Sequence, residues 1–120
     1  MKYHGDTISA ISTPLGVGAI SVIRITGENA IPVADEIIRS KKKITEVASR
    51  QAVFGRIFDG DHLIDEVLVT VFRKPHSYTG EDVVEISCHG SIFITNRILE
   101  ILLHKTRLAD PGEFTQRAFL

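Results

Sequence analysis

The sequence predicts an α+β domain with a mixed β-sheet of about five strands and helices packed on it. Short runs of β-branched residues bounded by glycine, proline and aspartate are typical of strands, and two longer segments carry apolar residues at helical spacing. The chain has 120 residues, of which 43% are hydrophobic and 24% are charged. These are the proportions of a globular protein, and the length allows one domain with one hydrophobic core.

Five segments are expected to form strands, because β-branched residues dominate each of them. They are Thr7–Ile11, Ala19–Thr26, Ala52–Phe58, Leu63–Arg73 and Asp82–Cys88. Asp59–His62 joins the third segment to the fourth, and Asp-Gly between apolar runs predicts a hairpin. Val67–Phe72 is almost wholly apolar, which predicts a central strand buried on both faces. Thr13–Gly18 and Pro75–Gly80 are expected to be loops, because proline and glycine interrupt regular structure.

Two helices are predicted from capping residues and apolar spacing. Asn29 is a suitable N-cap for a helix over Ala30–Arg39, with Pro32 in the first turn, where a missing N–H is harmless. Ser91 can cap a second helix that runs to about His104. Each helix has one apolar face. These faces comprise Ile31, Ala34 and Ile38 in the first helix, and Ile94, Ile98, Ile101 and Leu102 in the second.

Charge and cysteine content exclude several kinds of function. Lys plus Arg total 14 and Asp plus Glu total 15, and this net charge of −1 disfavours a broad surface for nucleic acid, DNA included. A single cysteine excludes a disulfide framework and a cysteine-based zinc site, and the five histidines lack the spacing of metal ligands. No apolar run approaches the ~20 residues of a membrane span. The first six residues lack the apolar stretch of a signal peptide, so we expect a cytoplasmic protein.

Charged residues gather at three places along the chain. Arg39–Lys43 is a basic cluster, which favours a solvated loop, with a contact to RNA or phosphate as the alternative. The acidic pairs Asp65-Glu66 and Glu81-Asp82 stand at strand starts, where we expect solvated caps. Nothing in their spacing indicates an acid–base dyad.

Cys88 and His89 are adjacent, which invites comparison with a nucleophile–base pair. Neighbouring residues on a strand point to opposite faces, so their side chains cannot easily form a hydrogen bond. A buried structural cysteine is therefore the favoured interpretation.

Arg24 and Glu85 are ionisable residues inside β-rich apolar segments. A buried charge costs several kcal/mol unless it is paired or hydrogen-bonded. Three interpretations remain open from the pattern alone. The two residues are paired structurally, are exposed on an open sheet face, or belong to a polar ligand site.

The last twelve residues have the pattern of a helix start followed by an apolar end. Pro111–Phe114 resembles the first turn of a helix, whereas Ala118–Leu120 is apolar, although chain termini are usually polar. A docked terminal helix and a chain that continues in a longer protein both explain this pattern, and we favour the second.

Three motifs carry a resemblance to a known family. DTISAISTP with the following AISVIRITG, then PHSYTGEDVVEISCHG, then ADPGEFTQRAFL resemble the N-terminal part of the MnmE (TrmE) family of tRNA modification GTPases. The similarity spans Asp6 to Leu120. The family's first loop usually reads like PPGRGG, and Pro14–Ala19 departs from it by lacking the basic residue.

The resemblance implies a fold and a ligand. It implies a domain over residues 1–120 that binds folate, forms a homodimer and is similar to the tetrahydrofolate-binding part of aminomethyltransferases. The ligand would be a one-carbon donor of the 5-formyltetrahydrofolate type. By motif position, Arg24 and Glu85 match the family's folate contacts, and a third contact, a lysine, would follow Leu120. No catalytic or metal-binding residue is implied within the chain.

The resemblance also implies partners outside this chain. Family proteins act with the flavoprotein MnmG (GidA) to modify the wobble uridine of certain tRNAs, giving the 5-carboxymethylaminomethyl type of modification. GTP, Mg²⁺ and K⁺ would belong to a GTPase domain which, with a helical domain, is absent from these 120 residues, so enzyme activity of the chain itself stays open. Two alternatives remain, namely a structural dimerisation module without folate binding and a stand-alone folate-dependent aminomethyltransferase-like protein.

Overall fold

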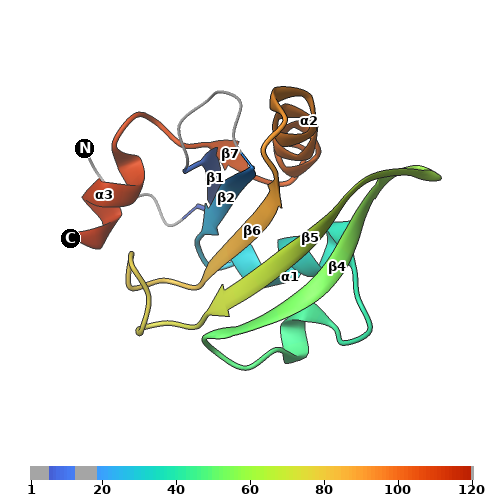
Figure 1. Cartoon of the computed structure of the whole chain (residues 1–120). Coiled ribbons are helices and arrows are strands. Elements are labelled where there is room, and N and C mark those ends of the chain that lie inside the picture. Colours follow the sequence, from blue (N-terminus) through green and yellow to red (C-terminus); the bar gives the residue numbers. More distant parts are fainter. Residues whose placement is uncertain (1–5, 13–18, 120) are drawn as a thin grey trace.

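The computed structural model describes residues 6–12 and 19–119. Its main feature is one seven-stranded sheet in the order β3-β4-β5-β6-β2-β1-β7 (Figure 1). The strands are β1 Ile8–Ile11, β2 Ile20–Thr26, β3 Ile38–Arg39, β4 Gln51–Asp59, β5 His62–Phe72, β6 Val83–His89 and β7 Arg107–Leu108. The helices are α1 Ala30–Ile37, α2 Ile92–Leu102 and α3 Glu113–Ala118, with a 3₁₀ turn η1 at Ile44–Glu46. The predicted loop Thr13–Gly18 lies outside the described residues.

The predicted α+β class and the mixed sheet are confirmed. All neighbouring strands are antiparallel except β1 and β7, which are parallel. The prediction of about five strands was wrong, because β3 and β7 extend the sheet at its two edges. Each has only two residues. A strand of that length has no readable alternation, so only pairing with a neighbour defines it.

The first helix is shorter than predicted. It ends at Ile37, because the backbone of Ile38 and Arg39 turns extended and pairs with β4. Gly55 on β4 makes room for this pairing, since a Cβ there would lie 2.5 Å from Cγ2 of Ile38. Asn29 stands at the N-cap position, but its side chain forms no capping hydrogen bond. Its backbone N–H donates instead to Oγ1 of Thr7 at 3.0 Å, which ties the start of α1 to β1.

The second helix follows the prediction more closely. Ser91 is the N-cap residue, and its Oγ accepts a hydrogen bond from the N–H of Ile94 at 3.4 Å. Ile98 and Leu102 are fully buried on the sheet side. The helix ends at Leu102 rather than His104.

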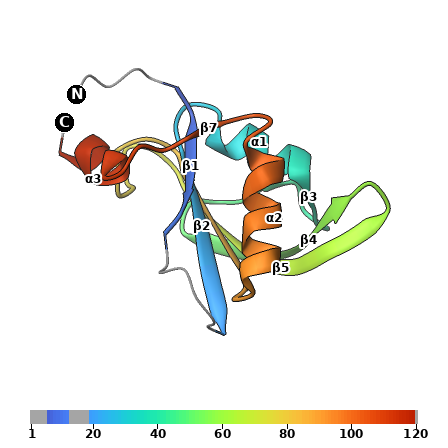
Figure 2. The ribbon, with the colours of Figure 1, turned by 90° about the horizontal axis from the view of Figure 1, so that it is seen from above.

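One face of the sheet is covered and the other is open. Figure 2 shows α1 and α2 on one side of β1 and β2, and α3 on the other. The hydrophobic core lies under α1 and α2, where alternate residues of the central strands are buried. On β5 these are Val67, Val69 and Val71, whereas Leu68 between them is 48% exposed. The prediction that Val67–Phe72 is buried on both faces was therefore wrong, because in the described part of the chain α1 and α2 cover only one face of β5.

None of the helices in the described part of the chain is long and apolar enough to cross a membrane.

Candidate ligand site on the open face

Strand register brings the two predicted site residues together on the open face of the sheet. Arg24 on β2 lies directly opposite Glu85 on β6. Ala10 on β1 flanks Arg24, and Thr70 on β5 flanks Glu85. This row crosses four neighbouring strands, and its small neighbours leave the charged pair accessible. The sequence placed each residue on its strand, but only the register places them side by side.

The two side chains form a close ion pair. Nε and Nη2 of Arg24 lie 2.9 and 2.7 Å from Oε2 of Glu85. The side chains are 26% and 27% exposed, so the pair is partly solvated. An ion pair that stays partly accessible to solvent adds little to folding stability, because solvent screens the attraction and desolvation opposes it. Of the three interpretations left open by the sequence, two therefore apply together: Arg24 and Glu85 are paired, and they lie on an open sheet face.

Tyr78 is a third member of the site that the sequence argument did not single out. Its ring centroid lies 5.3 Å from Cζ of Arg24, within the range of a cation–π contact. Its hydroxyl donates a hydrogen bond to Oγ1 of Thr115 at 3.2 Å. Tyr78 belongs to the same PHSYTGEDVVEISCHG motif that contains Glu85, and this shared motif was the available signal.

A cavity of about 450 Å³ adjoins the pair. One wall is the open face at Ala10, Ser12 and Arg24. The other wall is residues 109–115, which include the first turn of α3. Glu85 does not line this cavity, but its ion-pair partner Arg24 does. The sequence argument placed a helix start at Pro111–Phe114, which is confirmed by α3, but it did not connect this segment to Arg24.

An ion cluster holds this C-terminal segment against the sheet. Arg117 on α3 is 4% exposed, and its guanidinium donates to Oδ1 of Asp6 at 2.8 Å and to Oε2 of Glu113 at 3.2 Å. Arg107 on β7 donates to the same two carboxylates, each at 2.6 Å. Two arginines and two carboxylates thus join the start of β1 to α3.

The interactions within this cluster shift the pKa values of its carboxylates. Hydrogen bonding to Arg107 is the main cause that lowers the pKa of Asp6 and of Glu113, each to about 2. Glu81 joins the cluster, since its Oε1 accepts from Arg117 at 3.2 Å and from Oγ1 of Thr26 at 3.0 Å. Burial raises the pKa of Glu81, and the charge of Arg117 opposes that rise.

The acidic pairs at the strand starts were predicted wrongly in part. The side chain of Glu81 is only 15% exposed, so it is not a solvated cap. Asp65 is 7% exposed, and its Oδ2 accepts the backbone N–H of His89 at 2.8 Å. Its Oδ1 lies 2.6 Å from Nδ1 of the same histidine. Both carboxylates are held by residues at least 24 positions away along the chain, which a local pattern does not contain.

Cys88 has the structural role that was predicted. It is 3% exposed among core residues, while His89 next to it is exposed on the other face. Burial raises the pKa of the Cys88 thiol, which disfavours the reactive thiolate. Among the described residues, no group of three or more His, Cys, Asp or Glu side chains could hold a metal ion.

The fold is an α+β domain with a polar cavity between an open sheet face and the C-terminal segment. A family model described as the N-terminus of the GTP-binding protein TrmE matches residues 7–120. The chain belongs to this family.

Proteins named tRNA modification GTPase MnmE are similar over nearly the whole chain. The relative from Lactococcus lactis subsp. lactis is 51% identical over 116 residues, which cover 96% of this chain and 25% of the relative. The relatives from Caldicellulosiruptor saccharolyticus and Listeria welshimeri are 51% and 52% identical, again over 96% of this chain and 26% and 25% of their own lengths. The chain therefore spans about a quarter of the curated relatives it matches.

Proposed function

We propose that this chain is the folate-binding and dimerisation domain of an MnmE-type protein, with the aminomethyltransferase-like folate fold. It binds a one-carbon donor of the 5-formyltetrahydrofolate type. It serves modification of the tRNA wobble uridine in the cytoplasm, together with MnmG (GidA). GTP, Mg²⁺ and K⁺ act in parts of that protein outside these residues. The observation that carries the proposal is the partly exposed Arg24–Glu85 pair beside a cavity of about 450 Å³.

The donor set fits a folate. A pterin ring presents an edge of N–H donors, for which the carboxylate of Glu85 is a natural acceptor. Arg24 has only donors, so it suits a carbonyl, formyl or carboxylate oxygen of the ligand. Tyr78 adds an aromatic ring beside Arg24. A volume of about 450 Å³ lies in the range of pockets that hold small molecules.

Each residue has a distinct part in binding. Arg24 lines the cavity and contacts the ligand directly. Glu85 lies beside the cavity rather than in it, where it orients the guanidinium of Arg24 through their shared hydrogen bond and accepts from a ring edge that extends past Arg24 onto the open face. Tyr78 bridges Arg24 and Thr115, so it holds the segment 109–115 at the distance that the ligand requires. The bound folate would supply the one-carbon unit, and none of these three residues needs to transfer a proton.

The test is a titration of 5-formyltetrahydrofolate into wild type, Glu85→Gln and Arg24→Ala. Charge-assisted hydrogen bonds are typically worth ~1.5–3 kcal/mol, so each change should weaken binding roughly tenfold or more. Arg97→Ala is the matched control, because Arg97 also forms a partly exposed ion pair, with Asp59 and Glu100, away from the cavity. Wild-type affinity in folded Glu85→Gln and Arg24→Ala would remove both residues from the site.

A structural dimerisation module without folate binding is the second candidate. It is favoured by one observation, which is that apolar side chains remain exposed on the open face. Ile20 is 65% exposed and Leu68 is 48% exposed. Large exposed apolar residues that cluster on one face are typical of protein–protein contacts. On this candidate the titration above shows no saturable binding to wild type, whereas the chain still dimerises.

A further inference from the structure

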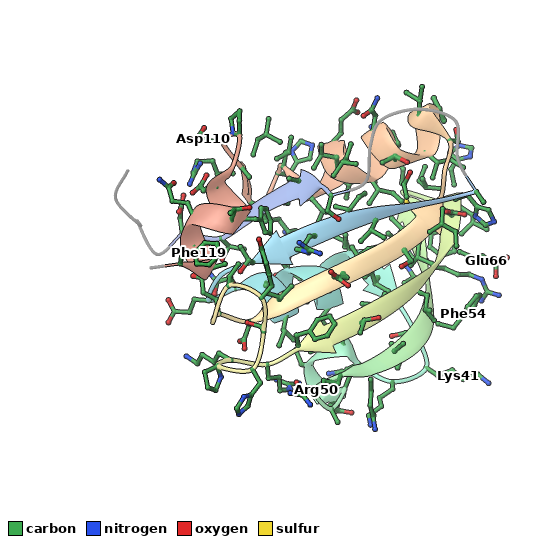
Figure 3. All side chains as sticks on the ribbon, turned by 60° about the vertical axis from the view of Figure 1, so that its left-hand side comes forward. Lys41, Arg50, Phe54, Glu66, Asp110 and Phe119 are labelled. Atoms are coloured by element: carbon green, nitrogen blue, oxygen red, sulfur yellow. The ribbon has the colours of Figure 1, made fainter. Side chains whose placement is uncertain are left out.

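A second cavity lies away from the proposed folate site, at the opposite edge of the sheet. It is a groove of about 710 Å³ between β4 and the segment that follows β3. We call it the basic groove, lined by Arg39, Ser40, Lys41, Lys42, Val53, Phe54 and Arg56. Figure 3 shows Lys41 and Phe54 at this edge, with Asp110 of the folate cavity on the other side of the molecule.

The basic groove concentrates positive charge in a chain whose net charge is −1. Four of its seven lining residues are cations and none is a carboxylate. Arg24, Arg97 and Arg107, which lie outside the groove, each pair with a carboxylate. Among the residues that the structure describes, Arg39, Lys41 and Lys42 form no such ion pair. The positive charge of the groove is therefore available to a ligand.

Arg56 differs, because Nη2 lies 3.6 Å from Oε2 of Glu66. Both side chains of this pair are about half exposed, and solvent screens such a contact strongly. Arg56 can therefore exchange Glu66 for a ligand anion at little cost.

The loop that carries the lysines is anchored at both ends. Arg39 pairs with Arg56 in the β3–β4 ladder, and its guanidinium lies 4.2 Å from the ring centroid of Phe58. Beyond the lysines, Ile44 is fully buried, and its N–H donates to Oδ1 of Asp35 at 2.7 Å. The side chain of Ser40 donates to the carbonyl of Lys42, which shapes the turn between these anchors. Lys41 and Lys42 therefore lie on a loop whose two ends are fixed to the rest of the fold.

The chemistry of the groove fits a polyanion with flat apolar groups. Lysines bind phosphate as point charges, and arginines bind it through paired N–H donors. Phe54 in the groove is 55% exposed, and Cζ of Arg56 lies 5.5 Å from its ring centroid. Cations that track a backbone beside an exposed aromatic ring are the features that bind unstacked nucleotides. An acidic peptide would use the charges but not the ring.

We propose that the basic groove binds the sugar–phosphate backbone of RNA, with one base against Phe54. The inference rests on the proposed function in one respect, which is the choice of RNA as the polyanion. The relatives are named as tRNA modification GTPases, and a tRNA is a polyanion with bases that can stack. The groove then holds RNA at the β3–β4 edge, while the folate cavity lies at the β1–β7 edge. One domain would thus contact both the one-carbon donor and the RNA.

The experiment measures anisotropy of a labelled, unmodified tRNA transcript titrated with this chain, from about 50 to about 200 mM salt. The variants are Lys41→Glu and Lys42→Glu. Lys74→Glu is the matched control, because Lys74 is exposed, lies outside the groove and changes the net charge equally. Each groove variant should weaken binding at least about fivefold and reduce the salt slope by roughly 0.7–0.9 per lost phosphate contact. The control should stay within about twofold of wild type, since it removes no such contact.

Three outcomes overturn the proposal. One is equal affinity for RNA in the groove variants and the control, and another is no binding by wild type at the lowest salt. The third is competition by polyglutamate as effective as that by unlabelled RNA, which assigns the groove to an acidic protein. Titration of Lys41→Glu with 5-formyltetrahydrofolate separates this proposal from the proposed function, because folate affinity should be unchanged whether or not RNA binds.

Discussion

Cys88 and His89 are adjacent in the sequence, yet one side chain is buried and the other is exposed. Successive side chains of β6 point to opposite faces, so Cys88 packs in the core and His89 stands outside. Sγ of Cys88 lies 3.5 Å from the carbonyl oxygen of Ser21 and 4.0 Å from Oγ1 of Thr95. These contacts hold the thiol in place, and burial keeps it protonated.

Replacement of Cys88 by serine should cost stability and leave the ligand site intact. A hydroxyl in this mostly apolar site recovers only part of its hydration through Ser21, so we expect the free energy of unfolding to fall by about 1–2 kcal/mol. Urea denaturation measures this change, and a folate titration of the folded variant gives the affinity. A folded Cys88→Ser protein without folate binding would show that the structural interpretation is wrong.

At the scale of elements, α3 depends on charge rather than on a hydrophobic face. It has six residues, and two of them, Glu113 and Arg117, are almost fully buried in the ion cluster. A helix this short is not stable alone. The ion cluster of Asp6, Arg107, Glu113 and Arg117 therefore positions the segment that forms one wall of the proposed folate cavity.

The ion cluster predicts a specific dependence of stability on pH. In the folded state the pKa values of Asp6 and Glu113 are about 2, below their ordinary values of 3.8 and 4.5. A lowered folded-state pKa means that the stabilisation is complete above the ordinary pKa and is lost as pH falls through the folded one. Stability should therefore fall between about pH 4.5 and pH 2.

Arg107→Met tests this cause directly. Without its main hydrogen-bond donor, the pKa values of Asp6 and Glu113 should return toward normal, so the free energy of unfolding should change less steeply over the same pH range. Chemical denaturation at a series of pH values measures the slope. Arg97→Ala, which breaks an exposed pair, should keep the wild-type slope. Parallel profiles for wild type and Arg107→Met would contradict this assignment.

At the scale of the whole molecule, the uncovered face of the sheet is the dominant feature. The face opposite α1 and α2 exposes Ile20 and Leu68 near the row that contains Arg24 and Glu85. A second copy of the chain would cover this apolar surface. Two-fold dimers are the commonest oligomers, which adds to the case for self-association.

We expect a dimer that depends on Leu68. Leu68→Glu places a charge in the proposed interface, and burial of an unpaired charge should shift the chain to monomers. Sedimentation equilibrium at micromolar concentration gives the mass of each species. Phe93→Glu is the control, because Phe93 is 75% exposed on α2, on the covered side of the sheet, and its variant should remain dimeric. A wild-type chain that sediments as a monomer at high concentration would rule the dimer out.

Local sequence patterns were enough to predict much of the fold and part of the candidate site. The predicted strands, the hairpin at Asp59–His62 and the cap at Ser91 all appear, with strand bounds that shift by one residue. Alternation and capping depend on neighbours within a few residues, so the sequence contains them directly. The inward position of Cys88 follows from the same alternation.

Tertiary structure alone decided the features that depend on distant pairing. The contact from Arg117 to Asp6 spans 111 positions, and the contact from Tyr78 to Thr115 spans 37. Leu68 is exposed because it lies on the face of β5 opposite the core, although its apolar neighbours in the sequence predicted a core residue. By itself, the sequence determined which segments are strands and helices and which family the motifs resemble. Register, edge strands and ion cluster came only from the folded chain, because they arise where segments far apart in sequence meet.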